Sequence, residues 1–241
     1  NAQEALDTTL MAYKIAENPN VLLPTMVCLD GFILTHTVEP VEIPDQDSVD
    51  KFLPPYVPEH AFLDPNQPMS IGNFADPNYY TEARHDMEVA MTNSIEVIQK
   101  TCEEFAEIFE REYGLVDAYK TEDAEIIFVA MGSLCSTIRV IVDQLREKGE
   151  KVGVITVRLY RPFSAKYFLR VLPKSVKRIA VLDRCKEPGS VGEPLYLDVK
   201  STLADQENSP LIIGGRYGLS SKDTSPAQIF AVFKNLKAKQ P

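Results

Sequence analysis

The stretch EIIFVAMGSLCSTIRVIVDQLREKGEKVGVITVRLY, residues 125–160, decides the fold of the second half of the chain. After Glu125, the first six residues are apolar on both faces, which is typical of a buried strand in a parallel sheet. A second such run covers residues 151–160, and between them apolar residues recur at helical spacing: Leu134, Ile138, Ile141, Val142 and Leu145. A strand, a helix and a strand in this order predict a right-handed crossover between parallel strands.

The same alternation continues toward the C-terminus. Further strands are predicted at residues 177–184 and 210–218, and helices at 164–173, 193–206 and 225–237. Helices on both faces of a mainly parallel sheet of four strands make this an α/β domain over residues 120–241. The glycines of GGRYG, residues 214–218, have the wrong spacing for a phosphate loop, and we interpret them as a tight loop at a contact.

The first part of the chain has a different pattern. A helix is predicted over residues 1–18, with Leu6, Leu10 and Tyr13 on one face, and the apolar run VLLPTMVCLD at 21–30 is interpreted as a buried strand. Because the chain opens directly in a helix, we read it as a piece of a longer polypeptide. Residues 1–115 are then the C-terminal part of an earlier α/β domain.

Eight of the 17 prolines lie between residues 40 and 77, which predicts an extended segment without regular structure. The same segment is rich in large apolar residues, so we expect it to lie against its own domain or a partner subunit. A long helix follows over residues 80–113, with an apolar stripe and Gly114 as its C-cap. The stripe comprises Met91, Ile95, Ile98, Cys102, Phe105, Phe109 and Tyr113.

Composition excludes several classes of function. The net charge of −10 opposes binding to nucleic acid or to anionic membrane surfaces, and no apolar run approaches the roughly 20 residues that span a bilayer. The four cysteines are scattered, without the close pairs that zinc or iron–sulfur sites use, so we expect no metal site here. Free cysteines of this kind favour a reducing cytoplasm.

Two short motifs are candidates for a site. Asp30, Gly31, Thr35 and His36 follow the predicted strand at 21–30, at the end of a sheet where open α/β folds bind ligands. Gly132 and Ser133 open a helix after the strand at 125–130, where backbone amides can hold an anion. Each has a plainer explanation: His36 can be a structural loop contact, and Ser133 can be a helix N-cap.

Longer motifs give a family resemblance. VCLDGFILTHTVEPVEIPDQDSVDKFLPPY (27–56), PMSIGNFADPNYYTEARHDM (68–87), VRLYRPF (157–163) and GGRYGLSSKDTSP (214–226) together resemble the α subunit of the pyruvate:ferredoxin oxidoreductases. The resemblance runs over essentially the whole chain. It implies a thiamine-diphosphate-binding-type domain over residues 1–115 and a domain similar to the transketolase C-terminal domain over residues 120–241.

The resemblance also implies an activity. The family decarboxylates a 2-oxoacid on thiamine diphosphate with Mg²⁺, passes electrons through [4Fe–4S] clusters to ferredoxin, and usually forms an acyl-coenzyme A (EC 1.2.7). Pyruvate is the expected substrate, giving acetyl-CoA and CO2 in anaerobic metabolism. The expected partners are ferredoxin and β-, γ- and δ-type subunits, which would hold most of the cofactors. This segment alone is then expected to be inactive, with no catalytic residue of its own.

Three alternatives stay open at this stage. The same family chemistry can act on oxalate, on a branched 2-oxoacid or on 2-oxoglutarate, and with oxalate coenzyme A would have no part. The chain can instead be a noncatalytic module for assembly. A stand-alone nucleotide binder is disfavoured, because no GxxxxGK[ST] or GxGxxG motif is present.

Overall fold

The computed structural model describes residues 1–58 and 60–238 and divides into two compact units. Unit 1 comprises Asn1–Cys28 and Glu39–Tyr113, and unit 2 comprises Leu29–Val38 and Gly114–Pro241. The segment Leu29–Val38 thus belongs to unit 2, although the first domain expected from the sequence runs unbroken through residue 115. That the two units correspond to the two predicted domains stays a prediction.

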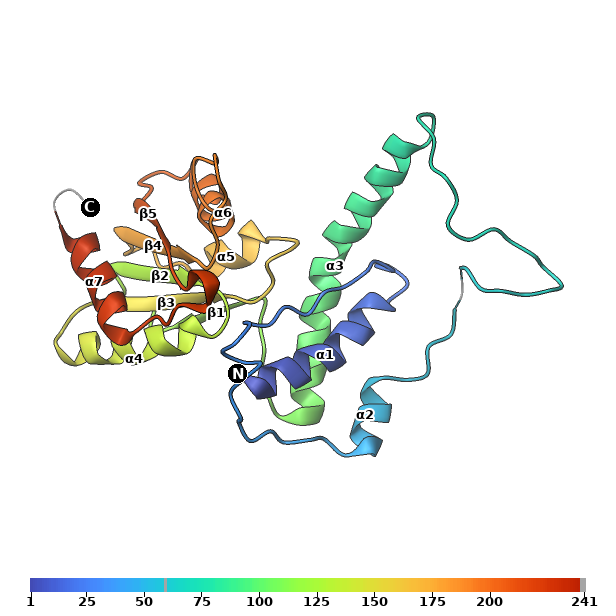
Figure 1. Ribbon diagram of the computed structural model, residues 1–241, viewed down its shortest axis with the longest axis horizontal. Coiled ribbons are helices and arrows are strands. Elements are labelled where there is room, and N and C mark those ends of the chain that lie inside the picture. Colours follow the sequence, from blue (N-terminus) through green and yellow to red (C-terminus); the bar gives the residue numbers. More distant parts are fainter. Residues whose placement is uncertain (59, 239–241) are drawn as a thin grey trace. The chain divides into compact units, whose positions relative to one another are not determined.

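Unit 2 is built on one five-stranded sheet (Figure 1). The strands are β1 (Val116–Tyr119), β2 (Ile126–Ala130), β3 (Val152–Val157), β4 (Arg178–Asp183) and β5 (Leu211–Arg216), in the order β1-β3-β2-β4-β5. β2 pairs in parallel with β3 on one side and β4 on the other, and β4 pairs in parallel with β5. β1 is antiparallel to β3. The prediction of an α/β fold with a mainly parallel sheet is confirmed.

Helices cover both faces of this sheet (Figure 1). The helices are α4 (Leu134–Glu147), α5 (Ala165–Val171), α6 (Pro194–Thr202) and α7 (Pro226–Lys237), with a short 3-10 turn, η1, at Leu219–Ser221. α4 and α7 pack on one face around Phe128 and Val154, while α5 and α6 pack on the other around Ile127 and Ile155. Every residue of β2 and β3 is buried, as an apolar run on both faces predicts.

Two details of the sheet differ from the sequence prediction. β1 is a fifth strand that the sequence did not predict. Its four residues, VDAY, are too few and alternate too little to identify an edge strand from sequence. Gly214 and Gly215 lie within β5 and are not part of a loop. A Cβ atom at Gly214 would lie 3.0 Å from the Tyr196 ring, and one at Gly215 would lie 2.8 Å from a methyl group of Leu182. The glycines therefore serve close packing.

The described part of unit 1 contains three helices: α1 (Ala2–Ala16), α2 (Gln46–Phe52) and α3 (Tyr80–Phe109). Its core consists of Met11, Phe52, Cys102, Phe105 and Phe109, in which the Phe52 and Phe105 rings meet edge to face at 5.3 Å. The C-terminal half of the predicted stripe on α3 thus contributes to the core of unit 1. α2 was missed because the surrounding prolines predicted extended chain throughout, yet Asp45 caps this helix and Phe52 anchors it.

Three other expectations for unit 1 were wrong. The run at 21–30 forms no strand, since the described part of unit 1 offers no neighbouring strand, and Met26 is 86% exposed. The C-cap of α3 is Glu110 in a left-handed conformation (φ 55°), not Gly114. The predicted face of α1 was wrong in part: Leu10 packs against the core, but Tyr13 is exposed, and the buried residues are Asp7 and Met11.

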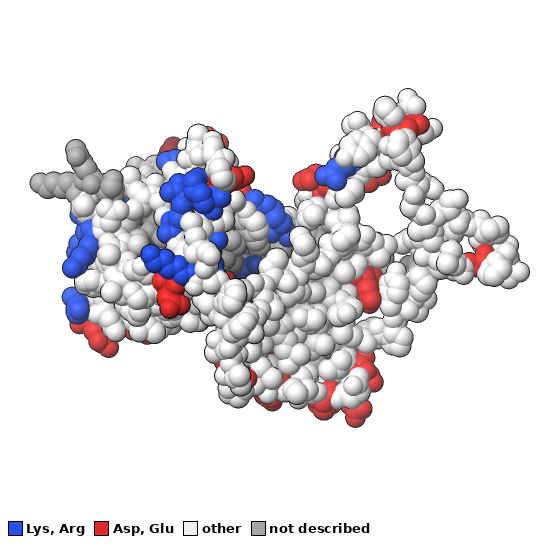
Figure 2. Space-filling view, in the orientation of Figure 1, with Lys and Arg blue, Asp and Glu red and all other residues white. Residues whose placement is uncertain are grey.

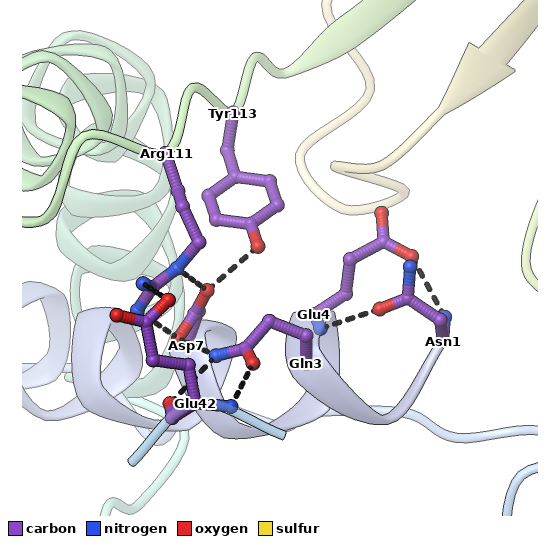
Figure 3. A network of polar contacts seen from close by, with 7 residues as sticks. All are labelled: Asn1, Gln3, Glu4, Asp7, Glu42, Arg111 and Tyr113. Carbon is purple, nitrogen blue, oxygen red and sulfur yellow. Dashed lines mark hydrogen bonds and ion pairs between the residues drawn. The ribbon is translucent and has the colours of Figure 1, made fainter. Parts of the chain in front are cut away.

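The carboxylate of Asp7 is buried and accepts four hydrogen bonds (Figure 3). Arg111 donates to it from Nε at 2.7 Å and from Nη2 at 3.1 Å, and the Tyr113 hydroxyl donates at 2.7 Å. Gln3 Nε2 adds a bond of 3.0 Å. Burial and the bond to Asp7 raise the pKa of Tyr113. A buried carboxylate is tolerated when it is paired and fully hydrogen-bonded, as Asp7 is here. Because its donors Arg111 and Tyr113 follow α3, the network joins α1 to the segment after α3.

Charge is unevenly divided between the units. Unit 1 carries 5 of the 25 Lys and Arg residues and 20 of the 35 Asp and Glu residues, a net charge of −15. Unit 2 carries 20 and 15, a net charge of +5. In Figure 2 the blue atoms gather over unit 2. The net charge of −10, which was used above to exclude nucleic acid and anionic membranes as partners, therefore describes neither unit.

Candidate functional site at the carboxyl edge of the sheet

The candidate site lies where the connections of the sheet diverge. After β2 the chain passes through α4 to β3 on one side, and after β4 it passes through α6 to β5 on the other side. Open α/β sheets bind ligands outside the carboxyl ends of strands at such a point. Gly132 and Ser133 follow β2, and Arg184 follows β4, so both border this position.

The side chain of Asp30 occupies the position that a ligand anion would take. Its Oδ2 accepts a hydrogen bond from the backbone N–H of Ser133 at 2.6 Å, and its Oδ1 accepts one from Nη1 of Arg184 at 3.0 Å. Helix N-termini bind anions through their free amides, and here the anion is a carboxylate of the same chain. We call Asp30, Gly132, Ser133 and Arg184 the joint.

The electrostatics of the joint favour the ionised carboxylate. Burial raises the pKa of Asp30, but hydrogen bonds from Ser133 and the guanidinium of Arg184 outweigh it, so the pKa lies below its usual value. Both side chains of the ion pair are mostly buried. Water therefore competes less than at an exposed pair, and the pair holds its two segments together more strongly.

Gly132 is required by the closeness of Asp30. Its φ is +70°, and a Cβ atom built there would lie 2.7 Å from Oδ2 of Asp30. Any larger residue would meet both backbone strain and a clash with the carboxylate. Ser133 is the N-cap residue by position, but its side chain makes no capping bond to the helix. Its contacts go to Asp30 instead, so neither the anion-binding interpretation nor the N-cap interpretation of Ser133 describes it fully.

Arg184 ties the loop to a second loop after β5. Its Nη2 donates to the carbonyl of Gly31 at 3.2 Å, and its Nε donates to the carbonyl of Gly218 at 3.1 Å. A planar guanidinium can bind several acceptors in fixed directions, which a lysine cannot do. Sequence reasoning missed this residue, although an arginine at the end of the strand predicted at 177–184 was a usable signal.

The exposed part of the loop forms a small platform. Thr35 Oγ1 accepts from the backbone N–H of Phe32 at 2.9 Å and lies 2.8 Å from Nδ1 of His36. The Phe32 and His36 rings stack at 4.7 Å with an angle of 20°. With Nδ1 engaged by Thr35, Nε2 is the ring nitrogen that remains to contact a ligand. All three side chains are exposed.

The structure thus brings the two predicted motifs together. Asp30 and Gly31 contact Ser133 and Arg184 directly, whereas Thr35 and His36 lie on the outer side of the same loop. The functional role of these residues stays a prediction. Among the described residues, no group of three His, Cys, Asp or Glu side chains could hold a metal ion.

A second carboxylate pair lies beside the joint. Asp183 accepts from the backbone N–H groups of Leu195 and Tyr196 at 2.9 and 3.1 Å, so it fills the N-terminus of α6. Burial raises the pKa of Asp183. Glu193 accepts from Arg216, from the backbone N–H of Glu187 and from Lys186, and its pKa is lowered to about 2. Both helix N-termini at this edge are therefore occupied by the chain itself.

A cavity of about 290 Å³ lies near the joint, between the end of β5 and α7. Its wall includes Gly218, whose carbonyl binds Arg184, and the charged residues Arg216, Lys222 and Asp223. The six residues predicted from the sequence are not among the described residues that line it. The cavity and the joint are thus neighbours that share one backbone segment.

Comparison with known proteins identifies the family. Residues 1–103 match the family model "Pyruvate flavodoxin/ferredoxin oxidoreductase, thiamine diP-bdg", and residues 124–229 match "Pyruvate:ferredoxin oxidoreductase core domain II". The pyruvate synthase subunit PorA of Methanothermobacter thermautotrophicus is 51% identical over 95% of this chain and 58% of its own length. The chain belongs to the pyruvate:ferredoxin oxidoreductase family.

Other members of the oxidoreductase family show the same relationship. PorA of Pyrococcus abyssi is 45% identical over 95% of this chain and 58% of its own length. The pyruvate:ferredoxin oxidoreductase of Moorella thermoacetica is 42% identical over 100% of this chain and 21% of its own length. Among solved structures, a 2-oxoglutarate:ferredoxin oxidoreductase from Magnetococcus marinus gives a TM-score of 0.47 at 15% identity, over 79% of this chain and 29% of that one. The chain therefore spans a little over half the length of the PorA subunits it resembles.

Proposed function

We propose that this chain is part of the α subunit of a multisubunit enzyme that oxidatively decarboxylates pyruvate and passes the electrons to ferredoxin. The observation that carries the proposal is the 51% identity to a pyruvate synthase subunit over 95% of the chain. The products would be CO2 and acetyl-CoA. We place the enzyme in the cytoplasm, because no disulfide joins the four cysteines, all of which lie in the described part of the chain. None of the helices described is long and apolar enough to cross a membrane.

The cofactors would be thiamine diphosphate with Mg²⁺, and [4Fe–4S] clusters. Thiamine diphosphate, when bound, stabilises the carbanion left by decarboxylation. The described residues form no cluster of metal ligands, and the cysteines Cys102 and Cys135 are buried in different units. The residues present therefore do not fit these groups by themselves, and we propose that partner subunits or domains complete their sites.

The contribution of this chain would be positional. The joint fixes the loop Leu29–Val38 on unit 2, and the loop in turn holds the Thr35–His36 pair and the Phe32 ring in one arrangement. A side chain held by its neighbours meets a substrate or a neighbouring domain without losing conformational freedom. Asp30, Gly31, Thr35 and His36 are therefore proposed to border the active site.

The activity is tested with the complete purified complex. Given pyruvate, coenzyme A and thiamine diphosphate, it is expected to reduce ferredoxin or a viologen dye, with a higher kcat/KM than for 2-oxoglutarate, oxalate or a branched 2-oxoacid. A preference for one of those acids would replace pyruvate as the substrate. Reduction that does not require coenzyme A would favour oxalate.

A noncatalytic role in assembly is the second candidate, and one observation favours it. Asp30 and Asp183 already occupy the helix N-termini at the ligand-binding edge of unit 2. Removal of residues 120–241 would distinguish the two roles. Lost assembly with intact thiamine chemistry in the remaining protein would assign assembly to unit 2, whereas a folded complex without turnover would assign it a catalytic role.

A further inference from the structure

The segment between α2 and α3 is an extended arm, which we define as residues 54–79 (Figure 1). It contains six prolines in 26 residues, and residue 59 lies outside the described part. The hydrogen bonds described for the arm are local, such as those from the backbone N–H of Gln67 to Asp64 and of Tyr79 to Asp76. Prolines limit the conformations of the free chain, so such a segment loses less entropy when it binds.

The arm carries large apolar side chains that its own unit does not cover. Phe74 is 90% exposed, Leu63 is 83% exposed and Val57 is 71% exposed. Tyr56, Phe62, Met69, Ile71 and Tyr79 are exposed as well. Single exposed apolar residues are normal, but eight within 26 residues form a surface of the kind that binds another protein. In Figure 2 this part of unit 1 is mostly white, with red atoms at a few places along it.

The uncovered surface continues into α3. Every residue from Tyr80 to Val89 is exposed, although these residues form the first turns of a regular helix. Helices in proteins gain most of their stability from packing one face against other residues. Tyr80 and Met87, seven residues apart and so on one side of the helix, would supply such a face, and nothing in the described part of unit 1 buries it.

The charges around this surface specify the partner. No lysine or arginine occurs between Lys51 and Arg84, whereas Asp64 and Asp76 lie within the arm. Unit 1 as a whole carries −15. Complementary charges suppress wrong partners and steer the right one, so the surface that receives the arm should be apolar with lysine or arginine at its rim.

We propose that the arm and the exposed start of α3 dock into an apolar groove with a basic rim on a different subunit of the same enzyme. The choice of a different subunit rests on the proposed function, because the relatives of this chain are named as subunits. Phe74 and Leu63 would be the apolar anchors, and Asp64 and Asp76 would pair with the rim.

The test uses the purified complex with a photo-crosslinking phenylalanine derivative in place of Phe74, and a matched complex with it in place of Val191. Val191 is 93% exposed on unit 2 and lies outside the proposed surface. We expect Phe74 to crosslink in high yield to a different subunit, and Val191 to do so much less. A crosslink within the α chain, a crosslink to a second α chain, or no crosslink at position 74 would overturn the proposal.

A substitution gives the affinity. The double variant Leu63→Ser, Phe74→Ser should raise the dissociation constant of the α subunit from the complex at least tenfold, whereas Val191→Ser should leave it unchanged. Equal dissociation constants would contradict the docking role. A complex that crosslinks at position 74 but does not oxidise pyruvate would refute the proposed substrate and keep the arm. A complex that oxidises pyruvate but does not crosslink at position 74 would support the proposed substrate and refute the docking of the arm.

Discussion

The carboxylate of Asp30 lies 2.6 Å from the backbone nitrogen of Ser133 and 3.0 Å from Nη1 of Arg184, although more than 100 residues separate Asp30 from either partner. A loop from the first part of the chain is thereby fixed at the carboxyl edge of a sheet formed by the last part. The arrangement gives a physical reason for the sequence DGF at 30–32 and GS at 132–133.

Loss of Arg184 should release the loop without unfolding unit 2. We expect Arg184→Met to speed hydrogen–deuterium exchange of the amides of Leu29–Val38, because three of its hydrogen bonds to the two loops disappear. Exchange of the buried amides of β2 should stay slow. Arg139→Met, which removes an exposed arginine of α4, is the control and should leave the loop unchanged. Unchanged loop exchange in Arg184→Met would show that other contacts hold it.

Gly132→Ala should destabilise the protein more than Gly149→Ala. Both glycines have a positive φ, so each alanine costs about 1–2 kcal/mol of backbone strain. Only at Gly132 does the new Cβ also meet a carboxylate, that of Asp30. Denaturant unfolding measures the two changes. In an Asp30→Gly background the excess cost at Gly132 should vanish, and an excess that persists would place its origin elsewhere.

Asp7→Asn should lower the free energy of unfolding by about 3 kcal/mol, because it breaks a buried ion pair and leaves Arg111 poorly compensated. Glu42→Gln is the matched control, since Glu42 contacts the same arginine from an exposed position. That change should cost about 0–1 kcal/mol. Similar costs for the two variants would mean that burial of Asp7 contributes little.

Glu193 should contribute stability that is lost in acid. Its pKa is about 2 in the folded protein against an ordinary 4.5, because Arg216, the Glu187 amide and Lys186 favour the ionised form. Since the folded pKa is the lower one, the contribution is complete above pH 4.5 and disappears as the pH falls toward 2. The difference in unfolding free energy between the wild type and Glu193→Gln should therefore shrink over this range. A difference that is constant with pH would exclude this origin.

The sequence predicted the sheet of unit 2 well because its central strands are continuous apolar runs. β2, β3 and β4 could be placed from their apolar runs, and the helices between them from the helical spacing of their apolar residues. The run at 21–30 has the same composition but no strand beside it in the described residues, and so it stays irregular. Pairing partners are a property of the fold, which a local pattern does not contain.

The site was predictable in its parts but not as a whole. Both DGF–TH and Gly132-Ser133 were predicted to lie at strand ends, where parallel sheets place functional groups. Gly132-Ser133 does follow a strand, whereas residues 21–30 form none. Their contact depends on how a loop from the first part of the chain lies on a sheet formed by the last part, with 103 positions separating Asp30 from Ser133. Arg184 was missed for the same reason, since its four acceptors come from two distant segments.

A double-mutant cycle on Asp30 and Arg184 tests most directly whether the chain's own carboxylate fills the anion position of the sheet. Unfolding free energies would be measured for Asp30→Asn, Arg184→Met and the double variant. If the pair joins the loop to unit 2, the two changes are coupled by about 1–3 kcal/mol, so the double variant loses less than the sum of the single losses. Strictly additive losses would contradict the joint.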